Sequence, residues 1–419
     1  MSPPKPTFNV PAGAAAKVSI IDSTLSIDGM NTGYLMGPDM PGFDVFPTIP
    51  TWSFLVESST GKKALFDLGV PPNYESAFTP LIQNKLKNSG FDVKVEAHVA
   101  DILKEGGVDP GSINGVIWRL VLSIVWVPGY GTILRYWWLS DMMLTQLAIG
   151  IGITLVTPQL FPGPQIWSSG LDSRMRSIPA TRRYQTAPSM KAASSKPFCL
   201  RHPPSSHQAT QFKYSHRARG RTLHEIDFTD PQKSLQVGPF RAYDYFSDGS
   251  FYLLDTPGHA IGHLAGLART SSSPDTFIFM GGDLCHHGAE IRPSPHLPLP
   301  PTKSLQDFLP LSESLRLRAS SCPGSNLFET LNTSRNRPAG GPFFQPTIGL
   351  DIPLAIKTIE KAQEADAQDD VFFVFAHDGS IRGVVDMFPA GANEWKAKGW
   401  REKTLWAFLR DLMPAVEKA

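Results

Sequence analysis

Residues 256–263 read Thr-Pro-Gly-His-Ala-Ile-Gly-His, and this stretch decides the fold of the chain. It follows an apolar run that predicts a strand, which ends at a Pro-Gly turn carrying His259. His263 comes four positions later. Two further predicted strands are also followed by polar residues, Gly-Gly-Asp ending at Asp283 and Ala-His-Asp containing His377. Two histidines and one aspartate at strand ends indicate one side of a two-metal hydrolase site.

Each of these residues also has a simpler interpretation. His259 can be an ordinary turn histidine, and Asp283 can cap the turn that follows it. His377 stands at a strand end before an Asp-Gly turn. Taken together, however, imidazole nitrogens and a carboxylate are the donors that zinc prefers, so the pattern favours metal ligands.

Composition narrows the class of protein. The chain has 419 residues, of which 41% are hydrophobic and 18% charged, enough for one large domain or two ordinary ones. Its net charge of +1 gives no reason to expect a nucleic-acid partner. The three cysteines are too few and too scattered for a disulfide framework or a cysteine-based zinc site. The N-terminus lacks the apolar run of a signal peptide, so we expect a cytoplasmic protein.

The chain divides into three parts by pattern. Residues 1–118 and 212–419 alternate strand pairs with helices, which predicts two halves of one α/β sandwich. Residues 119–211 do not fit, because an apolar, Trp-rich stretch is followed by a basic stretch rich in Ser and Pro. Within them, 142–161 is apolar and about long enough to cross a bilayer. Taken literally this predicts a membrane span and a disordered linker.

Four motifs in order resemble the metallo-β-lactamase superfamily, especially its lactonase-like members and related fungal-type hydrolases. They are Leu-Phe-Asp-Leu-Gly at 65–69, the stretch 256–263, Gly-Gly-Asp at 281–283 and Ala-His-Asp at 376–378. The resemblance implies a four-layer αββα sandwich with two zinc ions at one edge of its two sheets.

The same resemblance implies roles for individual residues. His259 would bind the first metal, His377 the second, and Asp283 would bridge them. From its position, His263 would support a ligand or begin a helix, and Asp67 would be a structural carboxylate or one that orients a ligand histidine. His286 stands where related lactonases place a tyrosine that contacts the substrate.

One motif of that family, H-x-H-x-D-H, is missing after the strand that ends at Trp118. A shifted reading frame over 147–158 permits S-H-W-H-W-D-H, and the codons for Arg119-Leu120 permit a splice donor. We therefore predict that residues 119–147 are translated intron and that roughly 148–200 are out of frame. A genuine membrane insertion is the alternative.

The expected function is a metallo-hydrolase of the lactonase or lactamase type. The resemblance implies that zinc-bound hydroxide opens a cyclic ester or amide, in secondary metabolism or xenobiotic detoxification. The partner would be a small-molecule lactone, lactam or ester, with no nucleic acid and no membrane. Three alternatives remain: a thioesterase or glyoxalase-type hydrolase, an inactive metal-poor remnant, and a protein held at a membrane by 142–161. The sequence does not identify further catalytic residues or an oligomeric state.

Overall fold

The structure, a computed structural model, describes two long parts of the chain. They are residues 6–117 except 78–79, and residues 223–418 except 261, 302–308 and 310–326. Between these parts it describes three strands, β7 (Leu122–Val125), β8 (Leu134–Trp137) and β9 (Thr154–Pro158). The predicted limits of the aberrant segment therefore fall mostly outside the described residues.

The first sheet contains seven strands in the order β10-β9-β6-β4-β3-β1-β5. β3 and β4 form an antiparallel hairpin, with Phe54 opposite Phe66. On the other side of β4 the pairing becomes parallel through β6, β9 and β10. The six strands not yet given bounds are β1 (Lys17–Asp28), β3 (Ile49–Glu57), β4 (Lys63–Phe66), β5 (Asp92–Lys94), β6 (Gly115–Ile117) and β10 (Leu223–Ile226).

The second sheet contains six strands in the order β11-β12-β13-β14-β15-β17. Its neighbours are antiparallel except for β15 and β17, which are parallel and connected through the long segment that includes a helix. The strands are β11 (Ser234–Val237), β12 (Phe240–Asp244), β13 (Phe251–Asp255), β14 (Leu264–Ser272), β15 (Asp275–Met280) and β17 (Val371–Val374).

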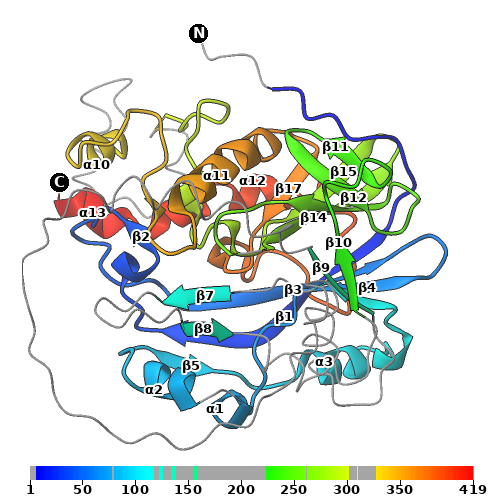
Figure 1. The fold of residues 1–419 in the computed structure, drawn as a ribbon. Coiled ribbons are helices and arrows are strands. Elements are labelled where there is room, and N and C mark those ends of the chain that lie inside the picture. Colours follow the sequence, from blue (N-terminus) through cyan, green and yellow to red (C-terminus); the bar gives the residue numbers. More distant parts are fainter. Residues whose placement is uncertain are drawn as a thin grey trace, which may run out of the picture.

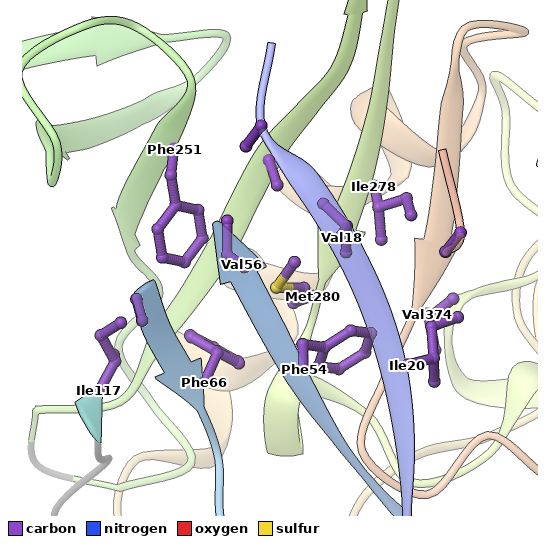
Figure 2. Packing of buried hydrophobic residues seen from close by; sticks show 14 of the residues in the cluster. Val18, Ile20, Phe54, Val56, Phe66, Ile117, Phe251, Ile278, Met280 and Val374 are labelled. Atoms are coloured by element: carbon purple, nitrogen blue, oxygen red, sulfur yellow. The ribbon is translucent and has the colours of Figure 1, made fainter. Parts of the chain in front are cut away.

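The two sheets pack face to face through a shared core. Alternate residues of a strand point to the same face, so Val18 and Ile20 of β1 both reach the core. Figure 2 shows these side chains between Phe54 of β3 on one sheet and Ile278 and Val374 on the other. All five are essentially inaccessible to solvent, and burial of this kind is the main favourable contribution to folding.

Helices cover the outer faces of both sheets (Figure 1). α11 (Ile352–Asp366) lies on the second sheet, where Ile359 and Ala362 join a core cluster with Phe279. It begins at Asp351, whose side chain accepts a hydrogen bond from the Leu354 amide. α1 (Tyr74–Ala77), α2 (Pro80–Lys87) and α3 (Val99–Glu105) lie on the first sheet. The predicted αββα sandwich is thus confirmed.

Short elements complete the described parts. They are β2 (Met36–Gly37), β16 (Gln345–Pro346), α7 (Gly288–Ile291), α10 (Glu329–Thr333), α12 (Trp400–Thr404) and α13 (Met413–Lys418), with the 3₁₀ turns η1 (Thr32–Tyr34), η2 (Pro110–Ser112), η5 (Gly282–Leu284), η6 (Gly379–Ile381) and η7 (Ala407–Arg410).

Residues 119–211, which we expect not to belong to the fold, contribute one strand, β9, to the first sheet. β9 pairs in parallel with β6 on one side and with β10 on the other, whereas β7 and β8 form a separate hairpin. Of the apolar stretch 142–161, only these β9 residues are described, and the rest lies outside the described residues. No helix in the described ranges is both long enough and apolar enough to cross a membrane.

Candidate active site

Three strands of the second sheet end at the same edge. β13 and β15 both run antiparallel to β14, so they are parallel to each other, and β17 is parallel to β15. Their carboxyl ends therefore meet, and the chain leaves each of them with a polar residue. His259 follows β13, Asp283 follows β15, and His377 follows β17.

The Asp283 carboxylate lies between the two imidazoles. Its Oδ1 is 3.2 Å from Nε2 of His377, and its Oδ2 is 3.8 Å from Nε2 of His259. The three side chains are between 13% and 18% exposed, so solvent still reaches them. The structure thus brings together the three residues that the sequence singled out.

His377 is held from the first sheet. Its Nδ1 lies 2.9 Å from the carbonyl oxygen of Pro50 and 3.2 Å from the hydroxyl of Thr51, both in β3. Trp52 fixes the same loop, because its indole nitrogen donates to the Asp378 carbonyl at 2.9 Å. A carbonyl oxygen can only accept, so in the neutral ring Nδ1 carries the proton and Nε2 presents its lone pair to Asp283.

This arrangement fits a metal cation. Two groups that both offer electron pairs, Nε2 of His377 and the Asp283 carboxylate, lie 3.2 Å apart, and they repel unless a proton or a cation lies between them. The donors are also of the kind that zinc takes. Yet no group of three or more His, Cys, Asp or Glu within the described ranges has the spacing to enclose a metal ion. The roles of His259, Asp283 and His377 as metal ligands therefore stay a prediction.

The His263 ring links the backbone of Asp283 to Thr256, the residue that follows β13. Its Nε2 accepts a hydrogen bond from the Asp283 amide at 3.2 Å, while Nδ1 lies 2.9 Å from both the hydroxyl and the carbonyl oxygen of Thr256. An amide can only donate, so the proton of the ring is on Nδ1 and points to Thr256. The side chain is buried, with 1% of its surface exposed. His263 thus holds the backbone of Asp283, and its role in orienting a metal ligand stays a prediction.

Asp67 occupies the corresponding edge of the first sheet. It follows β4 and adopts a left-handed backbone conformation with φ of 65°, which is uncommon for a residue with a side chain. Its amide donates to the carbonyl of Ile117 at 3.2 Å, so it sits beside the end of β6. The side chain is buried, and its role in orienting a ligand stays a prediction.

His286 lies against both histidines of the site. Its ring centroid is 5.1 Å from that of His259 and 5.8 Å from that of His377, onto which it stacks with an interplanar angle of 12°. Behind it lies Glu290, whose Oε2 accepts from the His286 amide at 2.5 Å and is 3.6 Å from Nδ1. Glu290 was not among the residues that the sequence predicted for the site. The four-residue spacing from His286 was the signal that could have linked them.

Two buried acids, Asp366 and Asp378, were also not predicted from the sequence. Asp366 forms a two-point ion pair with Arg292, at 2.8 Å and 2.6 Å, and both side chains are nearly inaccessible. Asp378 is buried directly after His377, and this desolvation raises its pKa to about 6, although Arg292 opposes the shift. Neither partner could be identified from sequence, because the contacts join segments far apart in the chain.

Comparison with known proteins agrees with the motifs. No family model matches the chain. It is 31% identical to Gamma-lactamase FDB1 of Fusarium pseudograminearum (strain CS3096), over 99% of this chain and 87% of the relative. It is also 31% identical to Metallo-hydrolase mfmC of Annulohypoxylon moriforme, over 99% of this chain and 92% of the relative. With Gamma-lactamase MBL2 of Gibberella moniliformis (strain M3125 / FGSC 7600) the identity is 34%, over 68% of this chain and 91% of the relative. The chain therefore belongs to the metallo-β-lactamase superfamily of metallo-hydrolases.

Proposed function

We propose that this protein is a metal-dependent hydrolase that opens a cyclic amide or cyclic ester. The observation that carries the proposal is the meeting of His259, Asp283 and His377 at the edge of the second sheet. Two relatives that are named gamma-lactamases support the cyclic amide as substrate class.

The surviving residues suit two zinc ions of which they supply only some ligands. His259 would hold one ion and His377 the other, and Asp283 would contribute its carboxylate. Divalent zinc bound there would activate water and polarise a carbonyl group. The protein's own contribution is positional: His263 fixes Asp283, and Pro50 and Thr51 fix His377.

We also propose that the native protein lacks part of the segment 119–211. The motif that would complete the ligand set belongs directly after β6, where the printed sequence departs from the pattern of the family. Sequencing the transcript between the codons for Ile113 and Ile226 tests this. A message without codons 119–147 supports a complete two-zinc site. A message that retains them as printed overturns this account and supports an inactive, metal-poor product.

The proposed activity is tested by metal content and hydrolysis together. The purified protein, encoded by the transcript found, is dialysed against zinc, and its bound metal is measured by elemental analysis. It is then offered five-membered lactams, lactones and simple thioesters. We expect about two zinc ions per chain and turnover of a lactam or lactone that stops after treatment with a chelator. Hydrolysis that survives complete removal of metal contradicts the proposal.

A further inference from the structure

The loop that carries His259 is tied to the beginning of α11. The carbonyl oxygen of His259 accepts a hydrogen bond from the Leu350 amide at 3.0 Å, and the carbonyl oxygen of Gly258 accepts one from the Asp351 amide at 3.0 Å. Asp351 is also the residue that caps α11. Backbone hydrogen bonds from two adjacent residues therefore fix two adjacent carbonyl groups relative to this helix.

A side chain of α11 holds the preceding carbonyl group. The hydroxyl of Thr358 donates to the carbonyl oxygen of Pro257 at 2.6 Å. A threonine within a helix often bonds to a carbonyl of its own helix, but Thr358, which is 4% exposed, bonds to a segment 101 positions away. Three consecutive carbonyl groups, at residues 257, 258 and 259, are thus held by the segment 350–358.

The loop lies too close to α11 for a side chain at residue 258. Gly258 has a φ of 128°, a conformation that favours glycine. A Cβ atom there would lie 2.3 Å from the amide nitrogen of Ala355, well inside van der Waals contact. Ala355 and Thr358 are three positions apart and therefore lie on one face of the helix. This face of α11 is in direct contact with the loop.

α11 is itself fixed on the second sheet without help from the loop. Ile359 and Ala362 are buried in the core cluster of that sheet. At the end of the helix, Asp366 forms its ion pair with Arg292. Hydrophobic burial and a charged pair thus anchor the helix, so it can act as a support for the loop.

We infer that Thr358 is a positioning residue for His259, acting through the Pro257 carbonyl, and that the beginning of α11 sets where His259 stands after β13. The inference rests on the proposed hydrolase function, in which His259 holds one of two metal ions. His377 is held by β3 of the first sheet, so separate elements position the two histidines. A change in α11 should therefore alter the affinity for one metal ion and not for the other.

The first test follows the hydrogen bonds and needs no metal. Amide hydrogen exchange is measured in the full chain by mass spectrometry, resolved to single residues. Without the Thr358 hydroxyl the loop separates from α11 more often, and the amides of Leu350 and Asp351 then lose their acceptors. We expect these amides to exchange roughly fivefold faster in Thr358→Val, and close to the wild-type rate in Thr358→Ser, which keeps the hydroxyl.

Thr404→Val is the matched control for this test. Thr404 is also 4% exposed, but its hydroxyl bonds within α12, to the Trp400 carbonyl at 2.9 Å. We expect the Leu350 and Asp351 amides to exchange in this variant as they do in the wild-type protein. Unchanged exchange in Thr358→Val, or equal acceleration in both valine variants, overturns the inference.

The second test measures metal binding. Zinc is added stepwise to the metal-free protein, wild type and variants, in competition with a chromophoric chelator. We expect one of two dissociation constants to rise roughly tenfold in Thr358→Val and to return to the wild-type value in Thr358→Ser, while the other does not change. Equal weakening of both ions in Thr358→Val overturns the inference.

The two tests separate failure of this inference from failure of the proposed function. If the wild-type protein binds no zinc, the proposed function fails, and amide exchange still decides whether Thr358 holds the loop. If the wild-type protein binds two zinc ions and Thr358→Val binds them with the same dissociation constants, the function stands and the inference is wrong.

Discussion

The two sheets contribute unequally to the same edge of the molecule. The second sheet ends in His259, Asp283 and His377, each placed by the last residues of a strand. The first sheet contributes support in the described residues: β3 holds Nδ1 of His377, and β4 places Asp67 beside β6. Within the described residues, the side chains that could bind metal thus come from the second sheet. Some of the groups that hold them in place come from the first sheet.

The difference teaches that the strand ends of one sheet can bring three candidate ligands together. Within the described residues, the Pro50 carbonyl holds His377 and the Trp52 indole holds the next residue, Asp378. The ring of His263 holds the amide of Asp283. Hydrogen bonds of this kind can orient a side chain before a metal binds to it. We expect the largest effects from substitutions of the candidate ligands themselves.

The largest effect is expected from Asp283→Asn. An amide presents one oxygen and one N–H group in place of two carboxylate oxygens, so it can no longer serve both His259 and His377. We expect bound zinc to be lost and kcat/KM to fall by at least about a thousandfold. Asp386→Asn, at an exposed ion pair with Lys398, is the matched control and should behave like the wild-type protein. Full zinc occupancy in Asp283→Asn would show that Asp283 is not a metal ligand.

The next effect concerns the buried ion pair between Arg292 and Asp366. Asp366→Ala leaves Arg292 buried without its partner, and we expect the free energy of unfolding to fall by about 3 kcal/mol in urea denaturation. The double variant Arg292→Met, Asp366→Leu removes both charges and should recover most of that loss. Equal free energies of unfolding for Asp366→Ala and the wild-type protein would show that the ion pair does not stabilise the fold.

Much of the fold followed from local pattern. The β3–β4 hairpin and the strands before His259, Asp283 and His377 were predictable, because alternation and turn residues are local signals. Since such strand ends meet at one edge, the convergence of the three residues was predictable too. Their roles as ligands remain predictions.

The rest depended on contacts between distant segments. The Arg292–Asp366 pair spans 74 positions, and the link from His377 to Pro50 spans 327. No periodicity encodes such pairs. The position of β9 was also not foreseen, because backbone hydrogen bonds along the edge of β6 accept any extended segment regardless of its side chains.

A smaller effect should distinguish ligands from the groups that fix them. In His263→Gln one side chain can no longer span the Asp283 amide and Thr256 together. We expect zinc affinity, measured by competition with a chromophoric chelator, to fall roughly 10- to 100-fold while the protein stays folded. His224→Gln, at an exposed position of β10, provides the control. Unchanged affinity in His263→Gln would mean that Asp283 is held well enough by η5 alone.

The smallest effect tests the core shared by the two sheets. Tyr245 packs on Phe246 and Phe251, and burial raises its pKa to about 12, with Tyr243 adding to the shift. The folded state therefore holds this proton more tightly than the unfolded state does. The stability that the protonated Tyr245 hydroxyl contributes is fully present below a pH of about 10. It is lost as the pH rises toward 12. Between pH 9 and 11 the wild-type protein should lose about 1 kcal/mol more stability in urea than Tyr245→Phe, which has no proton to lose there. Parallel pH profiles for the two proteins would place the Tyr245 hydroxyl in water and show that the core between the sheets ends short of it.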